Sequence, residues 1–130
     1  MAKKNLSKAR YHLRSYRKTL NLFRKFANHQ RDNYQNKYFF LLAEWHFFKG
    51  NLEKCMEYFE KTIQTSMESK FFYDQALAYE RMGEIFLILN NLFLARYYIE
   101  MSMRLFRQWG CYAKVDQMSV EFEDILVLRS

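Results

Sequence analysis

The sequence contains no proline and only three glycines among its 130 residues. Both residue types interrupt helices and build tight turns, so their scarcity argues against a protein of short strands and many turns. Leu, Phe, Tyr, Lys and Glu are abundant, and apolar residues recur mainly at three- and four-residue steps. That periodicity is typical of amphipathic helices, so we expect an all-α protein that is long enough to bury a core.

Long apolar runs and clustered cysteines are missing as well. No stretch approaches the roughly twenty apolar residues of a membrane-spanning helix. The first ten residues are basic and do not resemble a signal peptide. Cys55 and Cys111 lie in helical patterns, which favours free thiols, with a disulfide or a reactive pair as the alternative. These features predict a soluble, cytoplasmic protein.

Acidic residues are absent from positions 1–31, which carry ten Lys and Arg. The other 99 residues carry eleven bases and fourteen acids, so the net charge of +7 comes from this first segment. An amphipathic helix is predicted from about Asn5 to Asn28. Its basic side chains flank the apolar stripe and form a candidate patch for an anion or an acidic partner: Arg10, Arg14, Arg17, Lys18, Arg24 and Lys25.

Motifs for catalysis and metal binding are also missing. The three glycines are isolated, so the chain has no P-loop, and it contains neither HRD nor DFG of the protein kinases. His12, His29 and His46 fall on different segments, whereas a metal site needs convergent ligands. We therefore expect no catalytic, cofactor-binding or metal-binding residues, and we expect that the chain is not an enzyme.

The chain does contain an internal repeat at an offset of forty residues. Gly50-Asn51-Leu52 aligns with Asn90-Asn91-Leu92. The same alignment superposes further helical positions: Ala43 on Gly83, Cys55 on Ala95, Phe59 on Ile99 and Thr62 on Ser102. Two apolar-periodic segments around a polar turn, repeated in this way, are typical of stacked helical hairpins.

The repeat predicts one domain over residues 1–130 with about six helices. Its parts are a basic helix and connection (1–33), a first hairpin (36–69), a second hairpin (76–109) and a terminal helix (112–130). A polar break is expected at 66–69. Small residues let the paired helices approach closely, and glycines end helices. The residues with expected structural roles are Ala43, Gly50, Cys55, Gly83, Ala95, Trp109 and Gly110.

The spacing of the small residues and turns resembles the tetratricopeptide repeat. A longer resemblance rests on three segments, FANHQRDNYQNKYFFLLAEWHFFKGN, DQALAYERMGEIFLILNN and ARYYIEMSMRLFRQWGCYAKV. They are similar to the helical-repeat tail that follows the AAA-type ATPase region in large signalling proteins with kinase-like, sensory and histidine kinase domains. The segment 109–115, WGCYAKV, is similar to that family's WGAxAKV element, with Cys111 where alanine is usual.

This resemblance implies a short right-handed solenoid of tetratricopeptide-like hairpins. It also implies a non-catalytic protein–protein interaction scaffold for signal transduction, either as a module or as a detached segment of such a protein. The expected partner is a protein segment or a neighbouring signalling domain, and terminal repeats favour self-association. The candidate groove residues are Tyr38, Trp45, His46, Tyr79, Arg81 and Phe86. The alternative is an anion-binding module, for nucleic acid or an acidic membrane surface, that acts through the basic first helix.

Overall fold

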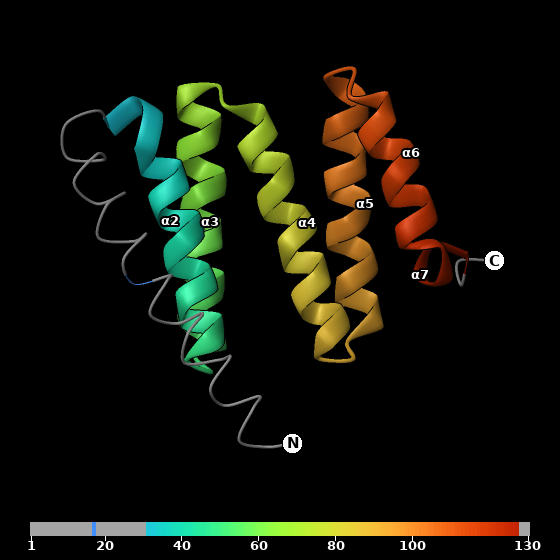
Figure 1. The fold of residues 1–130 in the computed structure, drawn as a ribbon, viewed down its shortest axis with the longest axis horizontal. Coiled ribbons are helices and arrows are strands. Elements are labelled where there is room, and N and C mark those ends of the chain that lie inside the picture. The colour runs from blue at the N-terminus through green and yellow to red at the C-terminus, as the bar shows by residue number, and fades with distance from the viewer. Residues whose placement is uncertain (1–16, 18–30, 128–130) are drawn as a thin grey trace. The chain divides into compact units, whose positions relative to one another are not determined.

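The computed structural model describes Arg17 and residues 31–127 (Figure 1). Within this part, all regular structure is helical. The six helices in chain order are α2 (Arg31–Phe48), α3 (Leu52–Ser69), α4 (Phe72–Ile88), α5 (Leu92–Gln108), α6 (Tyr112–Glu121) and α7 (Glu123–Val127). The predicted all-α class is confirmed. The predicted helix over 5–28 lies outside the described residues, except for Arg17, which is helical and exposed.

The chain divides into two compact units between Thr65 and Ser66, in the last turn of α3. We call residues 1–65 the N-terminal unit and residues 66–130 the C-terminal unit. In the N-terminal unit, Ala43 on α2 and Cys55 and Phe59 on α3 are fully buried. Phe40 meets Phe59 edge-to-face, with ring centroids 5.3 Å apart. Small and aromatic residues therefore pack between the two helices of this hairpin.

The turns between the helices repeat one backbone geometry every twenty residues. The residues with positive φ are Gly50 (79°), Lys70 (63°), Asn90 (61°) and Gly110 (77°). After each of them, an amide donates to a carbonyl five residues back: Asn51 to His46 (2.8 Å), Phe71 to Ser66 (2.9 Å), Asn91 to Phe86 (2.8 Å) and Cys111 to Phe106 (2.8 Å). This is the Schellman pattern of helix C-termini. Two twenty-residue steps account for the forty-residue repeat.

The predicted polar break at 66–69 is wrong. Helix α3 continues to Ser69, and the turn falls on Lys70 and Phe71. Thr62 and Ser66 are fully buried one helical turn apart, so small polar residues here face inward. The polar residues at 66–69 therefore do not mark the end of the helix, because small hydroxyl side chains can lie on a buried helix face.

Two further boundaries differ from prediction. Helix α2 begins at Arg31, inside the segment assigned to a connection, because polar residues without apolar periodicity still suit a first helical turn. The terminal helix is broken at Phe122 into α6 and α7. Phe122, at the break, and Ile125, in α7, are both buried in the core. A straight helix was expected because its apolar periodicity continues across Phe122.

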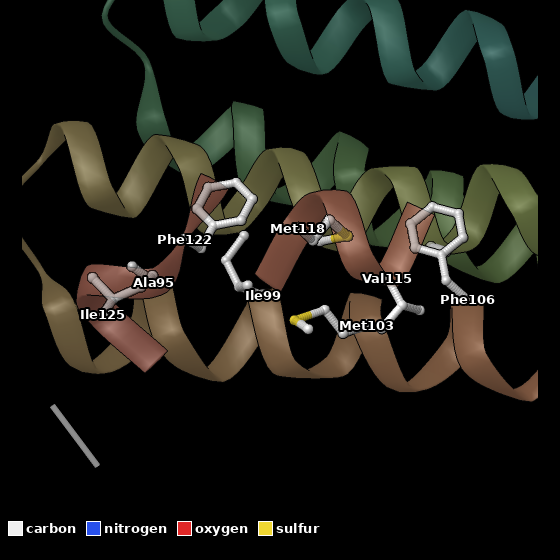
Figure 2. Packing of buried hydrophobic residues seen from close by; sticks show 9 residues of the cluster. Ala95, Ile99, Met103, Phe106, Val115, Met118, Phe122 and Ile125 are labelled. Carbon is white, nitrogen blue, oxygen red and sulfur yellow. The ribbon is translucent and has the colours of Figure 1, made fainter. Parts of the chain in front are cut away.

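The core of the C-terminal unit lies among α4, α5, α6 and α7 (Figure 2). Its buried side chains are Ala76, Ala95, Ile99, Met103, Phe106, Val115, Met118, Phe122 and Ile125. Helices α4 and α5 lie side by side and antiparallel (Figure 1). Gly83 and Ala95 are both buried where the two helices meet.

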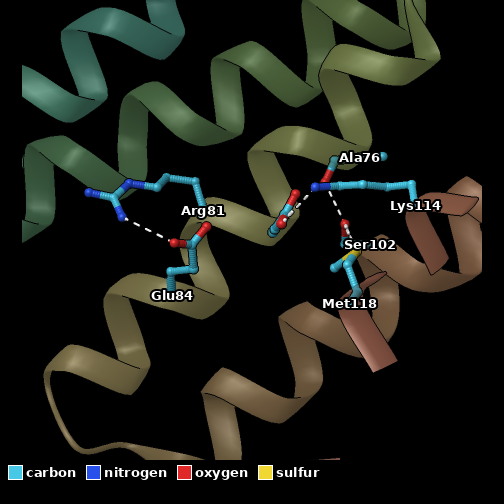
Figure 3. A network of polar contacts seen from close by, with 7 residues as sticks. Ala76, Arg81, Glu84, Ser102, Lys114 and Met118 are labelled. Carbon is cyan, nitrogen blue, oxygen red and sulfur yellow. Dashed lines mark hydrogen bonds and ion pairs between the residues drawn. The ribbon is translucent and has the colours of Figure 1, made fainter. Parts of the chain in front are cut away.

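Polar contacts join the helices of this unit (Figure 3). The buried Ser102 hydroxyl on α5 donates to the Ala76 carbonyl on α4 at 2.7 Å. The Lys114 ammonium on α6 donates to Glu80 Oε2 on α4 at 3.1 Å. The Glu80 side chain is 8% exposed, so this ion pair holds α6 against α4 largely out of water.

Candidate functional site

Three rings on one side of the N-terminal unit form an aromatic triad. The Tyr58 ring on α3 is parallel to the His46 ring on α2, with centroids 5.3 Å apart and planes 4° apart. Phe39, seven residues or about two helical turns before His46, stacks on the same Tyr58 at 6.1 Å. Lys61 lies 5.0 Å from the Tyr58 ring centre and 5.8 Å from that of Phe39. All three rings are half-buried, so part of each remains accessible.

The C-terminal unit contains the equivalent triad forty positions later. Tyr98 on α5 stacks on Tyr79 at 6.2 Å and on Phe86 at 5.7 Å, both on α4. Tyr97 adds an edge-to-face contact with Tyr98 at 5.1 Å. The three pairs of equivalent residues are Phe39 with Tyr79, His46 with Phe86, and Tyr58 with Tyr98. The same side-chain arrangement therefore occurs in both hairpins.

Half of the six predicted groove residues belong to these triads. His46, Tyr79 and Phe86 are triad members. The central tyrosine of each triad, on which the other two rings stack, was not predicted: Tyr58 in the first and Tyr98 in the second. The predicted groove residues all lie on the first helix of each hairpin, whereas Tyr58 and Tyr98 lie on the second. The forty-residue alignment pairs the two tyrosines and could have revealed them.

The other three predicted groove residues make different contacts. Tyr38 lies beside Phe39, with ring centroids 6.0 Å apart. Lys49 lies over the Trp45 ring, 5.0 Å from its centre. Arg81 pairs with Glu84 at 3.6 Å along α4 (Figure 3). All three are half-buried, and none of them contributes a ring to a triad.

Two triad members have shifted protonation equilibria. Burial lowers the pKa of His46 below its ordinary 6.5, Lys54 lowers it further, and Glu57 raises it. Burial raises the pKa of Tyr79 above 10.0, Tyr97 adds to that effect, and a hydrogen bond with the Gln75 side chain opposes it. At neutral pH His46 and Tyr79 are therefore both uncharged.

A separate apolar hollow of about 390 Å³ opens between the start of α4 and the end of α5. Phe72 and Trp109 stack 4.1 Å apart with planes 13° apart, and Tyr73 meets Phe106 edge-to-face at 5.2 Å. The hollow is lined by Lys70, Phe71, Phe72, Tyr73, Leu105, Phe106, Trp109 and Cys111. Trp109, predicted to be structural, is 52% exposed here, so one wall of the hollow faces solvent. Lys70 is the single charged residue in the lining.

A second, polar hollow of about 230 Å³ lies beside α5 and α7. It is lined by Glu100, Met103, Arg104, Arg107 and Leu126. Arg104 and Arg107 are exposed and form no ion pair within residues 31–127. Glu100, by contrast, lies 3.8 Å from Arg96. This hollow combines both signs of charge and contains no stacked rings.

The predicted anion patch is not visible as a surface, because Arg10, Arg14, Lys18, Arg24 and Lys25 lie outside the described residues. The described residues contain no group of three or more His, Cys, Asp or Glu that could hold a metal ion. Both cysteines are free thiols, Cys55 buried and Cys111 half-buried. Of the described helices, none combines the length and the apolar character needed to cross a membrane.

Comparison of the chain with protein-family models, with curated proteins and with solved structures found no match.

Proposed function

We propose that this chain is a non-catalytic scaffold that binds a polypeptide segment through its repeated helical hairpins. The observation that supports this function is the recurrence of the aromatic triad at an offset of forty residues. Ring spacings differ between the two triads by at most 0.4 Å, from 5.3 to 5.7 Å for one pair and from 6.1 to 6.2 Å for the other. A repeated, partly exposed aromatic group suits a scaffold that presents the same kind of contact more than once.

The chemistry of the triads favours a polypeptide as the ligand. Half-buried aromatic rings offer a large contact area and lose little conformational freedom on binding, so they are common at the centres of protein interfaces. Stacking fixes the orientation of Tyr58 and Tyr98 before any partner arrives. The proposed architecture is a short right-handed, tetratricopeptide-like solenoid.

The resemblance to signalling proteins supplies the proposed setting. On this proposal the chain is cytoplasmic and acts in signal transduction, and its partner is a neighbouring domain of an ATPase–histidine kinase system or a segment of one. Self-association through terminal repeats belongs to the same proposal, because an array of few repeats leaves apolar end faces uncovered.

A displayed library of random peptides tests the scaffold directly. Selected peptides are titrated against the parent chain, the triad variant His46→Ala/Phe86→Ala and the control variant Tyr112→Ala. Tyr112 is an exposed aromatic residue that belongs to neither triad. We expect the triad variant to weaken binding at least about tenfold, which is the loss of a typical aromatic hot spot, and the control to bind like the parent. Failure to select any peptide that depends on the triads overturns the proposal.

The anion-binding alternative is distinguished by its salt dependence. A short DNA duplex and vesicles of anionic lipid are titrated at two ionic strengths, with the parent and with an Arg10→Glu/Arg14→Glu/Arg17→Glu variant. Binding that falls steeply with salt and vanishes on charge reversal supports the alternative. Peptide binding that survives charge reversal supports the scaffold.

A further inference from the structure

The polar hollow beside α5 and α7 contains two arginines that have no partner of opposite charge. Arg104 and Arg107 both lie on α5 and line this hollow of about 230 Å³. Neither forms an ion pair within the described residues. Glu100, the acidic residue of the lining, lies 3.8 Å from Arg96 and is therefore already paired. The hollow keeps a positive charge that these helices do not neutralise.

The fold of the hairpin does not require this pair of arginines. Arg104 and Arg107 are three residues apart on α5, so their side chains are neighbours on one helix face and repel each other. The helix dipole favours a base in the last turn, which accounts for Arg107 but not for the pair. Forty positions earlier, α3 has the uncharged residues Gln64 and Met67. The pair therefore has a role other than forming the helix.

The surroundings of the hollow carry negative charge. Leu126 of α7 lines the hollow, and Glu123 lies about one helical turn before it. Glu123 and the adjacent Asp124 are exposed, and neither pairs with an arginine of the hollow. A membrane surface or a nucleic acid backbone spreads many anionic groups over a wide area and would meet these carboxylates. A single anionic group inside the hollow is therefore favoured over an extended polyanion.

A phosphoryl group suits the charge and the donors of the hollow. At neutral pH it carries nearly two negative charges, which two guanidinium groups balance, whereas a carboxylate carries only one. Guanidinium groups donate paired N–H bonds to phosphate oxygens, and neighbours on one helix face lie close enough to share one group. Met103 and Leu126 supply an apolar wall for the carbon atoms of the side chain that carries the phosphate.

We propose that the polar hollow binds a phosphorylated serine or threonine side chain of a partner polypeptide. Arg104 and Arg107 hold the phosphoryl group, and Glu100 stays paired with Arg96. The affinity of the partner then depends on its phosphorylation. This site goes beyond the scaffold function proposed above, because it uses neither aromatic triad.

Titration with N-acetyl-O-phosphoserine amide tests the hollow without any particular peptide sequence. Binding is followed by NMR of the backbone amides, and we expect a Kd on the order of 1 mM for the parent, because the probe is small. The variant Arg104→Gln/Arg107→Gln should bind at least about tenfold more weakly. The control variant Lys37→Gln/Lys70→Gln removes the same charge at two exposed positions outside the hollow. It should bind like the parent.

Two further measurements distinguish a phosphoryl site from a positively charged surface. The variant Arg104→Lys/Arg107→Lys keeps the charge but loses the paired donors, so it should bind the probe more weakly than the parent. The affinity of the parent should fall from pH 7.5 to pH 5, because the phosphoryl group takes up a proton with a pKa of about 6. N-acetylglutamate amide, which carries a single negative charge, should bind at least about tenfold more weakly than the phosphorylated probe.

Three results overturn the proposal. They are a parent that does not bind the probe up to about 20 mM, a glutamine variant that binds like the parent, and inorganic phosphate that binds as tightly as the probe. The third result would indicate a site for a free anion. Vesicles of anionic lipid that bind the parent but not the glutamine variant would also overturn it, by assigning the arginines to a membrane.

Folding and independence have their own controls. Circular dichroism melts confirm that each variant folds, and the single change Arg104→Gln replaces the double variant if that one does not fold. The triad variant His46→Ala/Phe86→Ala should bind the phosphorylated probe like the parent, because neither ring lines the hollow. The scaffold proposal and the phosphoryl-site proposal can therefore fail separately.

Discussion

Ile99 occupies the space that a side chain on Gly83 would need. A Cβ atom built on Gly83 would lie 2.6 Å from both Cδ1 and Cγ1 of Ile99, and 3.1 Å from the Ala95 carbonyl oxygen. Gly83 lies within α4 and has no positive φ, so it is present for close packing and not for backbone freedom. The absence of its side chain brings α4 and α5 together.

Replacing Gly83 by alanine is expected to destabilise the C-terminal unit. Alanine favours a helix over glycine by about 1 kcal/mol, but overpacking a tight crossing costs about 1–3 kcal/mol. We expect a net loss of about 1 kcal/mol and a lower midpoint in thermal denaturation. In an Ile99→Ala background, the same Gly83→Ala change should cost less than in the parent, because the two Ile99 atoms are gone and only the Ala95 carbonyl oxygen remains close. A Gly83→Ala variant that melts at or above the parent temperature contradicts this account.

Replacing Lys70 by glycine is expected to stabilise the protein. Lys70 has φ of 63°, and a residue other than glycine pays roughly 1–2 kcal/mol in this left-handed region. Glycine already occupies the equivalent turn positions 50 and 110. We expect Lys70→Gly to raise the free energy of unfolding by about 1 kcal/mol in urea denaturation. Lys61→Gly, inside α3, is the control and should lower it by a similar amount.

Removing only one partner of the Lys114–Glu80 ion pair is expected to lower the free energy of unfolding. Replacing Lys114 by methionine leaves the 8% exposed Glu80 carboxylate without its 3.1 Å partner. We expect a loss of about 2–3 kcal/mol, because a buried charge without a partner is strongly unfavourable. The double variant Lys114→Met/Glu80→Gln should recover much of that loss. Equal stabilities of the single and double variants in chemical denaturation would show that Glu80 does not depend on Lys114.

The shifted pKa of His46 predicts a contribution to stability that changes with pH. Because burial lowers the pKa in the folded state, the unfolded chain binds more protons as pH falls through 6.5. The contribution of neutral His46 is therefore fully present above pH 6.5. It is lost as pH falls from 6.5 to the folded pKa. Thermal denaturation of the parent should show the midpoint falling over this range.

The variant His46→Phe isolates this residue from the other histidines. Phenylalanine is the natural residue at the equivalent position, Phe86, where it stacks on Tyr98 at 5.7 Å. We expect the midpoint of the variant to depend less on pH below 6.5 than that of the parent. An identical pH dependence in the two proteins would assign the effect to other groups.

The sequence by itself determined the helical class and the repeat. Scarce helix breakers, apolar periodicity and the alignment of Gly50 with Asn90 predicted the hairpins, and both of these residues have left-handed backbone. These features are local, because backbone preference and side-chain spacing act within a few residues. The roles of Gly83 and Ala95 were predicted for the same reason, since small residues at matching helical positions imply close axes.

Only the tertiary structure decided which side chains meet and which remain exposed. Sequence polarity placed a break at 66–69, yet Ser66 is buried and Lys70 makes the turn. The triads form because rings from two helices come within stacking distance. Only the tertiary structure shows that Tyr58 and Tyr98 are the central rings, each stacked on two rings of the neighbouring helix. The exposure of Phe93 and Trp109 likewise depends on what the rest of the chain leaves uncovered. Periodicity marks an apolar face, but the packing of neighbouring elements determines whether that face is covered.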